Sequence, residues 1–262
     1  MSRKTSPCPP RFVALAQKLA DAAGIVARRN FRSGIDVIGK ADDSPVTIAD
    51  SEAESRMRAI IARECTDHGI VGEEYGAERI DAEHVWVLDP IDGTKSFISG
   101  VPLFGTLIAL VRRGRPILGI IDQPVLRERW IGVVGRPTRF CGKTARSRAC
   151  GRIAEATLFA TSPHMFHGDD AAAFERVRSA VRLPRYGGDC YAYGLPASGH
   201  VDIVIEAGLK PRDYLAQVPI IEGAGGALTD WEGRPLTLES GRRICAAGDR
   251  KLHRKVLGLL AG

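Results

Sequence analysis

The sequence predicts an α/β protein in which helices and sheets form alternating layers. Three observations support this fold class: an amphipathic helical pattern opens the chain, β-rich segments dominate the rest of its first half, and strand-like and helix-like pieces alternate in its second half. With 262 residues, the chain can bury a sizeable core without disulfides or structural metals.

The first half contains two helical patterns and a predicted antiparallel meander. Apolar residues recur at helical spacing over 11–32 and again from Asp50 to about residue 68. Val-Trp-Val-Leu at 85–88 indicates a buried strand that ends at Asp89. Short charged or glycine-containing links then join three β-rich segments, at 106–111, 117–121 and 130–134. Such links favour antiparallel pairing.

The second half alternates between the two kinds of element. The predicted strands are 158–160, 201–205, 227–229 and 244–247, and the predicted helices are 170–181, 190–197, 214–224 and one from about 250 onward. We find no internal repeat and no flexible linker. We therefore expect a single unit over 1–262, with a flexible tail at 1–10 and two halves at 11–146 and 147–262.

Charge and cysteine content narrow the possible partners and compartment. Lys and Arg exceed Asp and Glu by 37 − 31 = 6, but the excess is scattered and aromatic residues are few, so we expect no nucleic-acid partner. The six cysteines form no CxxC pair and have no zinc-ligand spacing, which favours reduced thiols in a cytoplasmic protein. The first ten residues lack the apolar region of a signal peptide, and no apolar run is long enough to span a membrane. We expect no membrane partner.

The segment with most chemical information is Trp-Val-Leu-Asp-Pro-Ile-Asp-Gly-Thr-Lys-Ser-Phe, at 86–97. Its proline and glycine favour a tight turn that aims Asp89 and Asp92 into one pocket. Converging carboxylates stay ionised only beside strong positive charge, and oxygen ligands without His or thiolate suit Mg²⁺ or Mn²⁺. Gly93 leaves backbone N–H groups open to an anion, and Thr94 adds a hydroxyl. The pattern indicates a metal and phosphate site, although an ordinary turn is the structural alternative.

Three further acidic positions could complete such a site, and each has its own structural alternative. Glu73, in Gly-Glu-Glu after a predicted strand, could equally lie in an exposed acidic loop. Asp50 and Asp213 each begin a predicted helix, where a carboxylate commonly caps backbone N–H groups.

Four segments occur in the order typical of one known family. They are Ser44–Asp50, Gly72–Glu74, Asp89–Thr94, and Asp213 ahead of Glu222–Gly226. In these segments the chain resembles the inositol monophosphatase-like metal-dependent phosphatases. The resemblance implies a layered α-β-α-β-α sandwich of the inositol monophosphatase or sugar phosphatase type. It also implies a homodimer and lithium-sensitive catalysis by Mg²⁺.

The resemblance also implies a set of metal ligands at the matching positions. The first metal would be held by Glu73, Asp89 and the backbone carbonyl of Ile91, and the second by Asp89, Asp92 and Asp213. The expected cofactor is Mg²⁺, with two or three ions in each site and Mn²⁺ as the alternative. One ion lowers the pKa of the attacking water, and another stabilises the leaving alkoxide.

Other matching positions receive catalytic and substrate-binding roles. Asp50 would pair with Thr94, beside a third metal where there is one, to activate water, and Glu73 belongs to the same catalytic group. Backbone N–H groups of Gly93 and Thr94 would bind the phosphate. The residues expected to contact the phosphate ester are Glu73, Ile91, Asp92, Gly93, Thr94, Gly187, Gly188, Asp189, Glu206 and Asp213.

Two segments resemble the histidinol-phosphate phosphatase branch of the family. One contains Lys95-Ser96, where inositol phosphatases more often have Thr-Asn and adenosine-bisphosphate phosphatases have Lys-Glu; the other is Gly187–Gly194. Asp189 and Glu206 fall at substrate positions, and two carboxylates suit the ammonium and imidazole groups of histidinol phosphate. A helix cap and a surface strand end are the respective structural alternatives.

The expected enzyme is therefore a Mg²⁺-dependent histidinol-phosphate phosphatase of histidine biosynthesis, acting on a small phosphorylated metabolite. The alternatives are an inositol-1-phosphatase or a broad small-metabolite monophosphatase and, with less support, a 3′-phosphoadenosine 5′-phosphate phosphatase. A non-catalytic metal- or phosphate-binding protein on the same fold is disfavoured, because all the expected ligands are present. Arg212 stands where many family members have Trp, which predicts a changed rim of the substrate pocket.

Overall fold

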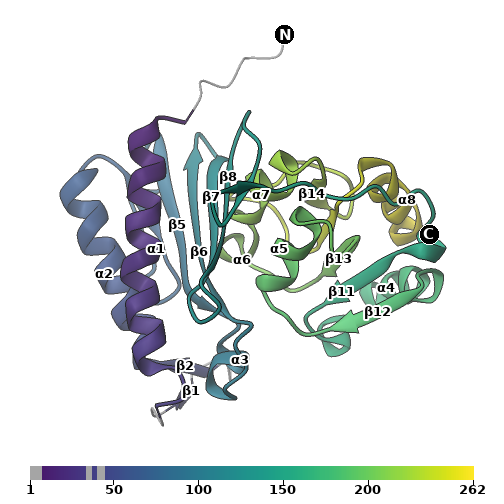
Figure 1. Cartoon of the computed structure of the whole chain (residues 1–262), viewed down its shortest axis with the longest axis horizontal. Coiled ribbons are helices and arrows are strands. Elements are labelled where there is room, and N and C mark those ends of the chain that lie inside the picture. The colour runs from purple at the N-terminus through teal and green to yellow at the C-terminus, as the bar shows by residue number, and fades with distance from the viewer. Residues whose placement is uncertain (1–7, 34–36, 40–44) are drawn as a thin grey trace.

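Five layers, in the order helices, sheet, helices, sheet, helices, make up the molecule (Figure 1). The computed structural model describes residues 8–33, 37–39 and 45–262, and for 37–39 and 45–47 the backbone alone. Three apolar clusters fill the spaces between successive layers. The predicted α-β-α-β-α sandwich is therefore confirmed. None of the described helices is both long enough and apolar enough to cross a membrane.

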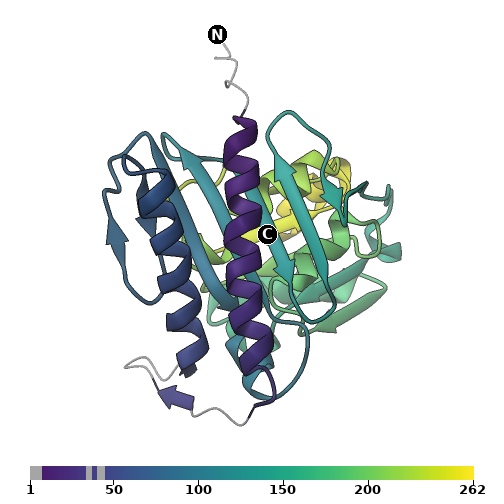
Figure 2. The same ribbon diagram turned by 60° about the vertical axis from the view of Figure 1, so that its left-hand side comes forward.

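The first layer consists of α1 (Pro10–Asn30) and α2 (Ile48–Glu64), which run side by side across one face of the first sheet (Figure 2). The apolar stripe of α1 is buried as its spacing predicts. The flexible tail was predicted to extend to residue 10, but this boundary is wrong. The Cys8 side chain is buried, and α1 begins at Pro10. Residues 1–7 lie outside the described residues.

The first sheet has eight strands in the order β10-β9-β8-β7-β6-β5-β3-β4. The strands β5 to β10 form the antiparallel meander, and β3 pairs parallel to β5. The strand bounds are β3 Gly69–Val71, β4 Ala77–Glu78, β5 His84–Asp92, β6 Gly105–Arg112, β7 Arg115–Gln123, β8 Glu128–Val133, β9 Arg139–Phe140 and β10 Lys143–Thr144. A separate two-stranded ribbon contains β1 (Val37–Gly39) and β2 (Pro45–Thr47).

The strand was predicted to end at Asp89, but β5 continues to Asp92. Its pairing register with β6 shifts between these two residues. The irregularity absorbs Pro90, which has no N–H group to donate to a regular ladder. The short helix α3 (Thr94–Ile98) follows directly.

The second sheet has five strands in the order β12-β11-β13-β15-β14 and mixed directions. The β11 strand pairs parallel to β12 and β13, and β15 pairs antiparallel to β13 and β14. The strand bounds are β11 Thr157–Ala160, β12 Leu183–Tyr186, β13 Ile203–Glu206, β14 Ala227–Asp230 and β15 Ile244–Ala247. Its strands lie within 157–247 and those of the first sheet within 69–144.

The middle layer contains α5 (Tyr191–Ala197), α6 (Pro211–Tyr214) and α7 (Gln217–Gly223). The helix predicted at 214–224 is confirmed as α7 over 217–223, but its expected start is wrong. A separate helix, α6, ends at Tyr214, and a continuous helix would bring the carbonyl of Leu215 against the ring of Pro219. The outer layer contains α4 (Asp169–Ala180) and α8 (Arg250–Ala261). Single 3₁₀ turns lie at Ile153–Glu155 and Pro163–Met165.

Candidate active site

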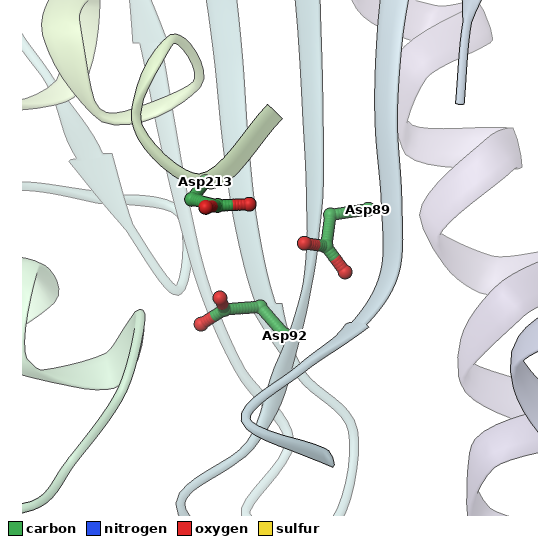
Figure 3. A group of neighbouring side chains, drawn as sticks. All are labelled: Asp89, Asp92 and Asp213. Atoms are coloured by element: carbon green, nitrogen blue, oxygen red, sulfur yellow. The ribbon is translucent and has the colours of Figure 1, made fainter. Parts of the chain in front are cut away.

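Three carboxylates meet where β5 faces the start of α6. Asp89 and Asp92 lie on either side of the β5 irregularity, and Asp213 lies in α6. One ligand oxygen from each of the three lies within 4.8 Å of the others. In Figure 3 the three side chains point toward a common space. The fold thus brings together the set predicted for the second metal.

Burial and mutual repulsion make this cluster unfavourable without a cation. Burial, followed by neighbouring carboxylates, raises the pKa of Asp89 and of Asp92 well above the usual value. Burial also raises the pKa of Asp213. Oδ1 of Asp89 is buried with no hydrogen-bond partner among the described residues. A buried oxygen without a donor, beside further carboxylate oxygens, fits a hard divalent cation.

Backbone groups fix the orientation of two of these carboxylates. The backbone N–H of Cys190 donates to Oδ2 of Asp92 at 2.6 Å. The backbone N–H of Lys210 donates to Oδ2 of Asp213 at 2.8 Å. Asp213 therefore caps α6, as its structural alternative proposed, and also lies in the carboxylate cluster.

Arg212 lies between two of the predicted metal ligands. Its Nη2 donates to Oε1 of Glu73 at 3.0 Å, and its Nε lies 3.6 Å from Oδ1 of Asp213. The side chains of Arg212 and Glu73 are each 18% exposed, so this guanidinium contacts the site itself and not only its outer rim. Glu73 is held by a cation of the chain, and its binding to a metal stays a prediction.

At the end of β5, the backbone of Gly93 lies close to the side chain of Asp189, which leaves no room for a Cβ. Gly93 has φ +87°, and a Cβ there would lie 2.7 Å from Oδ2 of Asp189. The Thr94 hydroxyl donates to the carbonyl oxygen of Ile91 at 3.2 Å. Asp50 is buried in the first turn of α2. The pairing of Asp50 with Thr94 stays a prediction.

A small cavity beside the cluster is lined by two of its carboxylates, Asp92 and Asp213, and by two further carboxylates, Asp189 and Glu206. The Ser96 hydroxyl donates to Oδ2 of Asp189 at 2.5 Å. Two features that suggested the substrate separately, Lys95-Ser96 and Asp189, are therefore in direct contact. Asp189 follows Gly187 and Gly188 and, like them, has a positive φ, in its case +44°.

Glu206 is buried, which excludes its alternative as a surface strand end. It accepts hydrogen bonds from the backbone N–H of Thr161 at 3.0 Å and from the hydroxyl of Tyr193 at 2.8 Å. The Thr161 hydroxyl is a third donor. These donors hold the Glu206 carboxylate in one orientation at the cavity wall.

Glu54 supports the loop that contains Glu73, although its sequence position was not singled out as functional. Glu54 is fully buried and accepts the backbone N–H groups of Glu74 at 2.7 Å and Tyr75 at 3.2 Å. It also pairs with Arg58 at 2.8 Å. A carboxylate inside the apolar stripe of α2, four residues before an arginine, was the feature that could have revealed it.

Glu206 gives the metal-free protein a predictable pH dependence. Burial raises the pKa of Glu206 to about 7 from 4.5, so the folded form retains a proton that the unfolded chain releases between these values. Stability that is complete below the lower pKa is lost as the pH rises through the upper one. The loss from this residue is on the order of 3 kcal/mol. With metal chelated, we expect the Tm to fall from pH 5 to pH 8.

The Glu206→Gln variant is expected to show a smaller fall in Tm over the same range, since the neutral amide has no charge to bury. Its oxygen can still accept from Thr161, and its NH₂ group can donate to the Tyr193 hydroxyl oxygen. The exposed Glu239→Gln is the control and is expected to keep the wild-type slope. Thermal unfolding at each pH measures both, and an equal slope in Glu206→Gln and wild type would contradict this assignment.

Comparison with known proteins agrees with this fold. Residues 10–261 match the inositol monophosphatase family. A chloroplastic bifunctional phosphatase, IMPL2 of Arabidopsis thaliana, is 52% identical over 94% of this chain and 74% of its own length. A histidinol-phosphatase of Chlorobaculum parvum is 36% identical over 84% of this chain and 86% of its own. An inositol monophosphatase from Zymomonas mobilis has a structure with TM-score 0.89 and 47% identity, over 96% of this chain and 98% of that one.

A five-layer fold with a buried carboxylate cluster that fits a divalent cation defines the class of metal-dependent phosphatases to which these relatives belong. The chain belongs to the inositol monophosphatase family and is a phosphatase of that family.

Proposed function

We propose that this phosphatase hydrolyses histidinol phosphate to histidinol and phosphate. The observation that supports this substrate is the pair of carboxylates, Asp189 and Glu206, on the wall of the cavity that Asp92 and Asp213 also line. An ammonium or imidazolium group placed between them would gain charge-assisted hydrogen bonds that a neutral polyol would not. Relatives named histidinol-phosphatase, at 36% and 34% identity, are consistent with the proposal.

The proposed cofactor is Mg²⁺, with a first ion at Glu73, Asp89 and the Ile91 carbonyl and a second ion at Asp89, Asp92 and Asp213. Bound Mg²⁺ would supply Lewis-acid stabilisation of the phosphoryl oxygens and a lower pKa for the attacking water. Mn²⁺ accepts similar oxygen ligands and is the alternative ion.

The remaining steps are assigned to groups of the chain. Backbone N–H groups of Gly93 and Thr94 would orient the phosphate. Asp50, beside Thr94, would accept a proton from the attacking water. A third ion would lie next to Asp50 if three are bound. The homodimer and the cytoplasmic location stay predictions from the sequence.

A phosphate-release panel tests the substrate. We expect kcat/KM with histidinol phosphate to exceed kcat/KM with inositol 1-phosphate and with 3′-phosphoadenosine 5′-phosphate. Faster hydrolysis of inositol 1-phosphate would instead favour the inositol monophosphatase alternative, which the Zymomonas mobilis relative supports. Similar values for all three would indicate a broad monophosphatase.

The same panel applied to Asp189→Asn separates substrate recognition from chemistry. Losing one charge-assisted hydrogen bond is expected to lower kcat/KM for histidinol phosphate by about 10- to 100-fold. Inositol 1-phosphate, which has no cationic group, is the matched control in the same variant and should lose much less. An equal loss with both substrates would contradict the proposed role of Asp189.

A further inference from the structure

A second concave site lies apart from the carboxylate cluster, on the face of the first sheet that α1 covers. It has a volume of about 670 Å³ and is bounded by α1, the end of β7, and β8 and β9. It shares no lining residue with the cavity that contains Asp92 and Asp213. Five arginines line it: Arg28, Arg127, Arg129, Arg136 and Arg139.

Most of this positive charge is not neutralised within the described part of the chain. Arg129 is paired twice, with the buried Asp122 at 2.6 Å and with Asp21 at 2.7 Å. Arg127 and Arg136 are exposed, and neither forms an ion pair within residues 8–33 and 45–262. The five guanidinium groups are thus accompanied by two paired carboxylates, Asp21 and Asp122, which leaves an excess of positive charge around the cavity.

The lining of the cavity is partly apolar. Val13 of α1 and Ile131 and Val133 of β8 line it together with the arginines. The volume lies within the range of about 300–1,000 Å³ found for small-molecule sites. Guanidinium groups match the geometry of phosphate oxygens, with two parallel N–H donors each. A lining that combines apolar side chains with several guanidinium groups suits a compound with both an organic body and several negative charges.

We propose that this arginine-lined cavity binds a small molecule with several phosphate charges, as a site separate from the catalytic one. The ligand class covers inorganic polyphosphates and nucleotides, since both present the same phosphate oxygens to the arginines. Pyrophosphate and adenosine monophosphate are the probes that separate these two sources, because only the nucleotide also has an organic body to cover the apolar side chains.

Cys141 provides a readout that is specific to this cavity. It lines the cavity and is exposed, whereas the other five cysteines of the chain are buried. We expect the uncharged reagent N-ethylmaleimide to modify Cys141 in the Mg²⁺-loaded enzyme, with the modified residue identified by peptide mass spectrometry. A probe at ten times its dissociation constant leaves about one site in eleven free, so modification is expected to slow about tenfold.

Two kinds of variant test whether the probe protects Cys141 from N-ethylmaleimide by binding in this cavity. Arg136→Gln and Arg127→Gln change exposed side chains, and each is expected to weaken probe binding by about tenfold or more through a lost charge-assisted contact. Arg254→Gln, an exposed arginine of α8 outside the cavity, is the matched control and should keep full protection. Asp92→Asn, which alters the carboxylate cluster, should also keep it.

Several outcomes would overturn the proposal. These are modification that neither probe slows, protection that both arginine variants retain, and protection that Asp92→Asn removes. Slow modification that depends on protein concentration and not on the probe would instead show that a second copy of the chain covers the cavity. None of these readouts depends on which phosphate ester the enzyme hydrolyses, so the proposal and the histidinol phosphate assignment can fail independently.

Discussion

The Asp92→Asn variant is expected to lose at least about 10³-fold in kcat, which corresponds to about 4 kcal/mol of transition-state stabilisation. Asp92 lies within 4.8 Å of Asp89 and Asp213 and lines the proposed substrate cavity, so its charge serves both the cation and the reaction. The amide keeps the oxygen that accepts the Cys190 N–H, and the local backbone should therefore be unchanged.

The same substitution lowers activity but is not expected to lower the stability of the metal-free protein. Removing one of several mutually repelling, buried carboxylates should leave the metal-free Tm equal to or above that of the wild type. The rise in Tm that Mg²⁺ gives the wild type should shrink or vanish. Thermal unfolding with and without Mg²⁺, beside steady-state phosphate release, measures both effects.

Asp230→Asn is the matched control for this experiment. Asp230 is a buried carboxylate in β14, outside the cluster, and accepts the backbone N–H groups of Glu232 and Arg234, which an amide oxygen can also do. We expect near-normal kcat in this variant. Near-normal turnover in Asp92→Asn would show that the proposed metal assignment is wrong.

The Glu54→Ala variant is expected to lower the free energy of unfolding by about 3–5 kcal/mol. It removes the acceptor of the Glu74 and Tyr75 N–H groups and one partner of Arg58, in a fully buried position. Gly72 packs so closely on this side chain that a Cβ there would lie 1.9 Å from Oε1 of Glu54. Loss of the carboxylate therefore releases the loop that contains Glu73.

A purely structural role and a positioning role for Glu54 can be separated. Glu54→Gln keeps an acceptor oxygen, so we expect a smaller loss of stability but a weaker dependence of Tm on Mg²⁺ if Glu73 is displaced. Glu52→Ala is the control on the same helix: its ion pairs are with the partly exposed Arg29 and Arg56, and it should cost less than about 1 kcal/mol. Chemical denaturation measures stability, and a wild-type response of Tm to Mg²⁺ in Glu54→Gln would refute the positioning role.

Much of the layered fold could be predicted because its determinants are local. The helical spacing of α1 and the short links between β6, β7 and β8 act over a few residues, so pattern and propensity indicate them directly. The exceptions arose where one residue breaks a regular element. The β5 strand continues past Pro90 with an irregularity in its pairing, and Pro219 follows the break between α6 and α7.

The candidate site also contains residues that the sequence could indicate and contacts that it could not. Asp89, Asp92, Gly93 and Thr94 could be singled out from sequence because they lie in one short turn after a buried strand. Contacts between distant segments could not: the Arg212–Glu73 ion pair and the Ser96–Asp189 hydrogen bond each join residues that different layers or sheets bring together. Only the packing of α6 against β5, and of the loop before α5 against α3, decides them.

The sequence by itself determined the type of most elements, the fold family and the set of acidic residues available for a metal and a phosphate ester. The tertiary structure alone decided that Glu54 is buried beneath the Glu73 loop, that Arg212 lies between Glu73 and Asp213, and that five arginines surround a second cavity. The physical reason is that burial and charge pairing depend on which side chains the layers place opposite each other. Local spacing does not specify that arrangement.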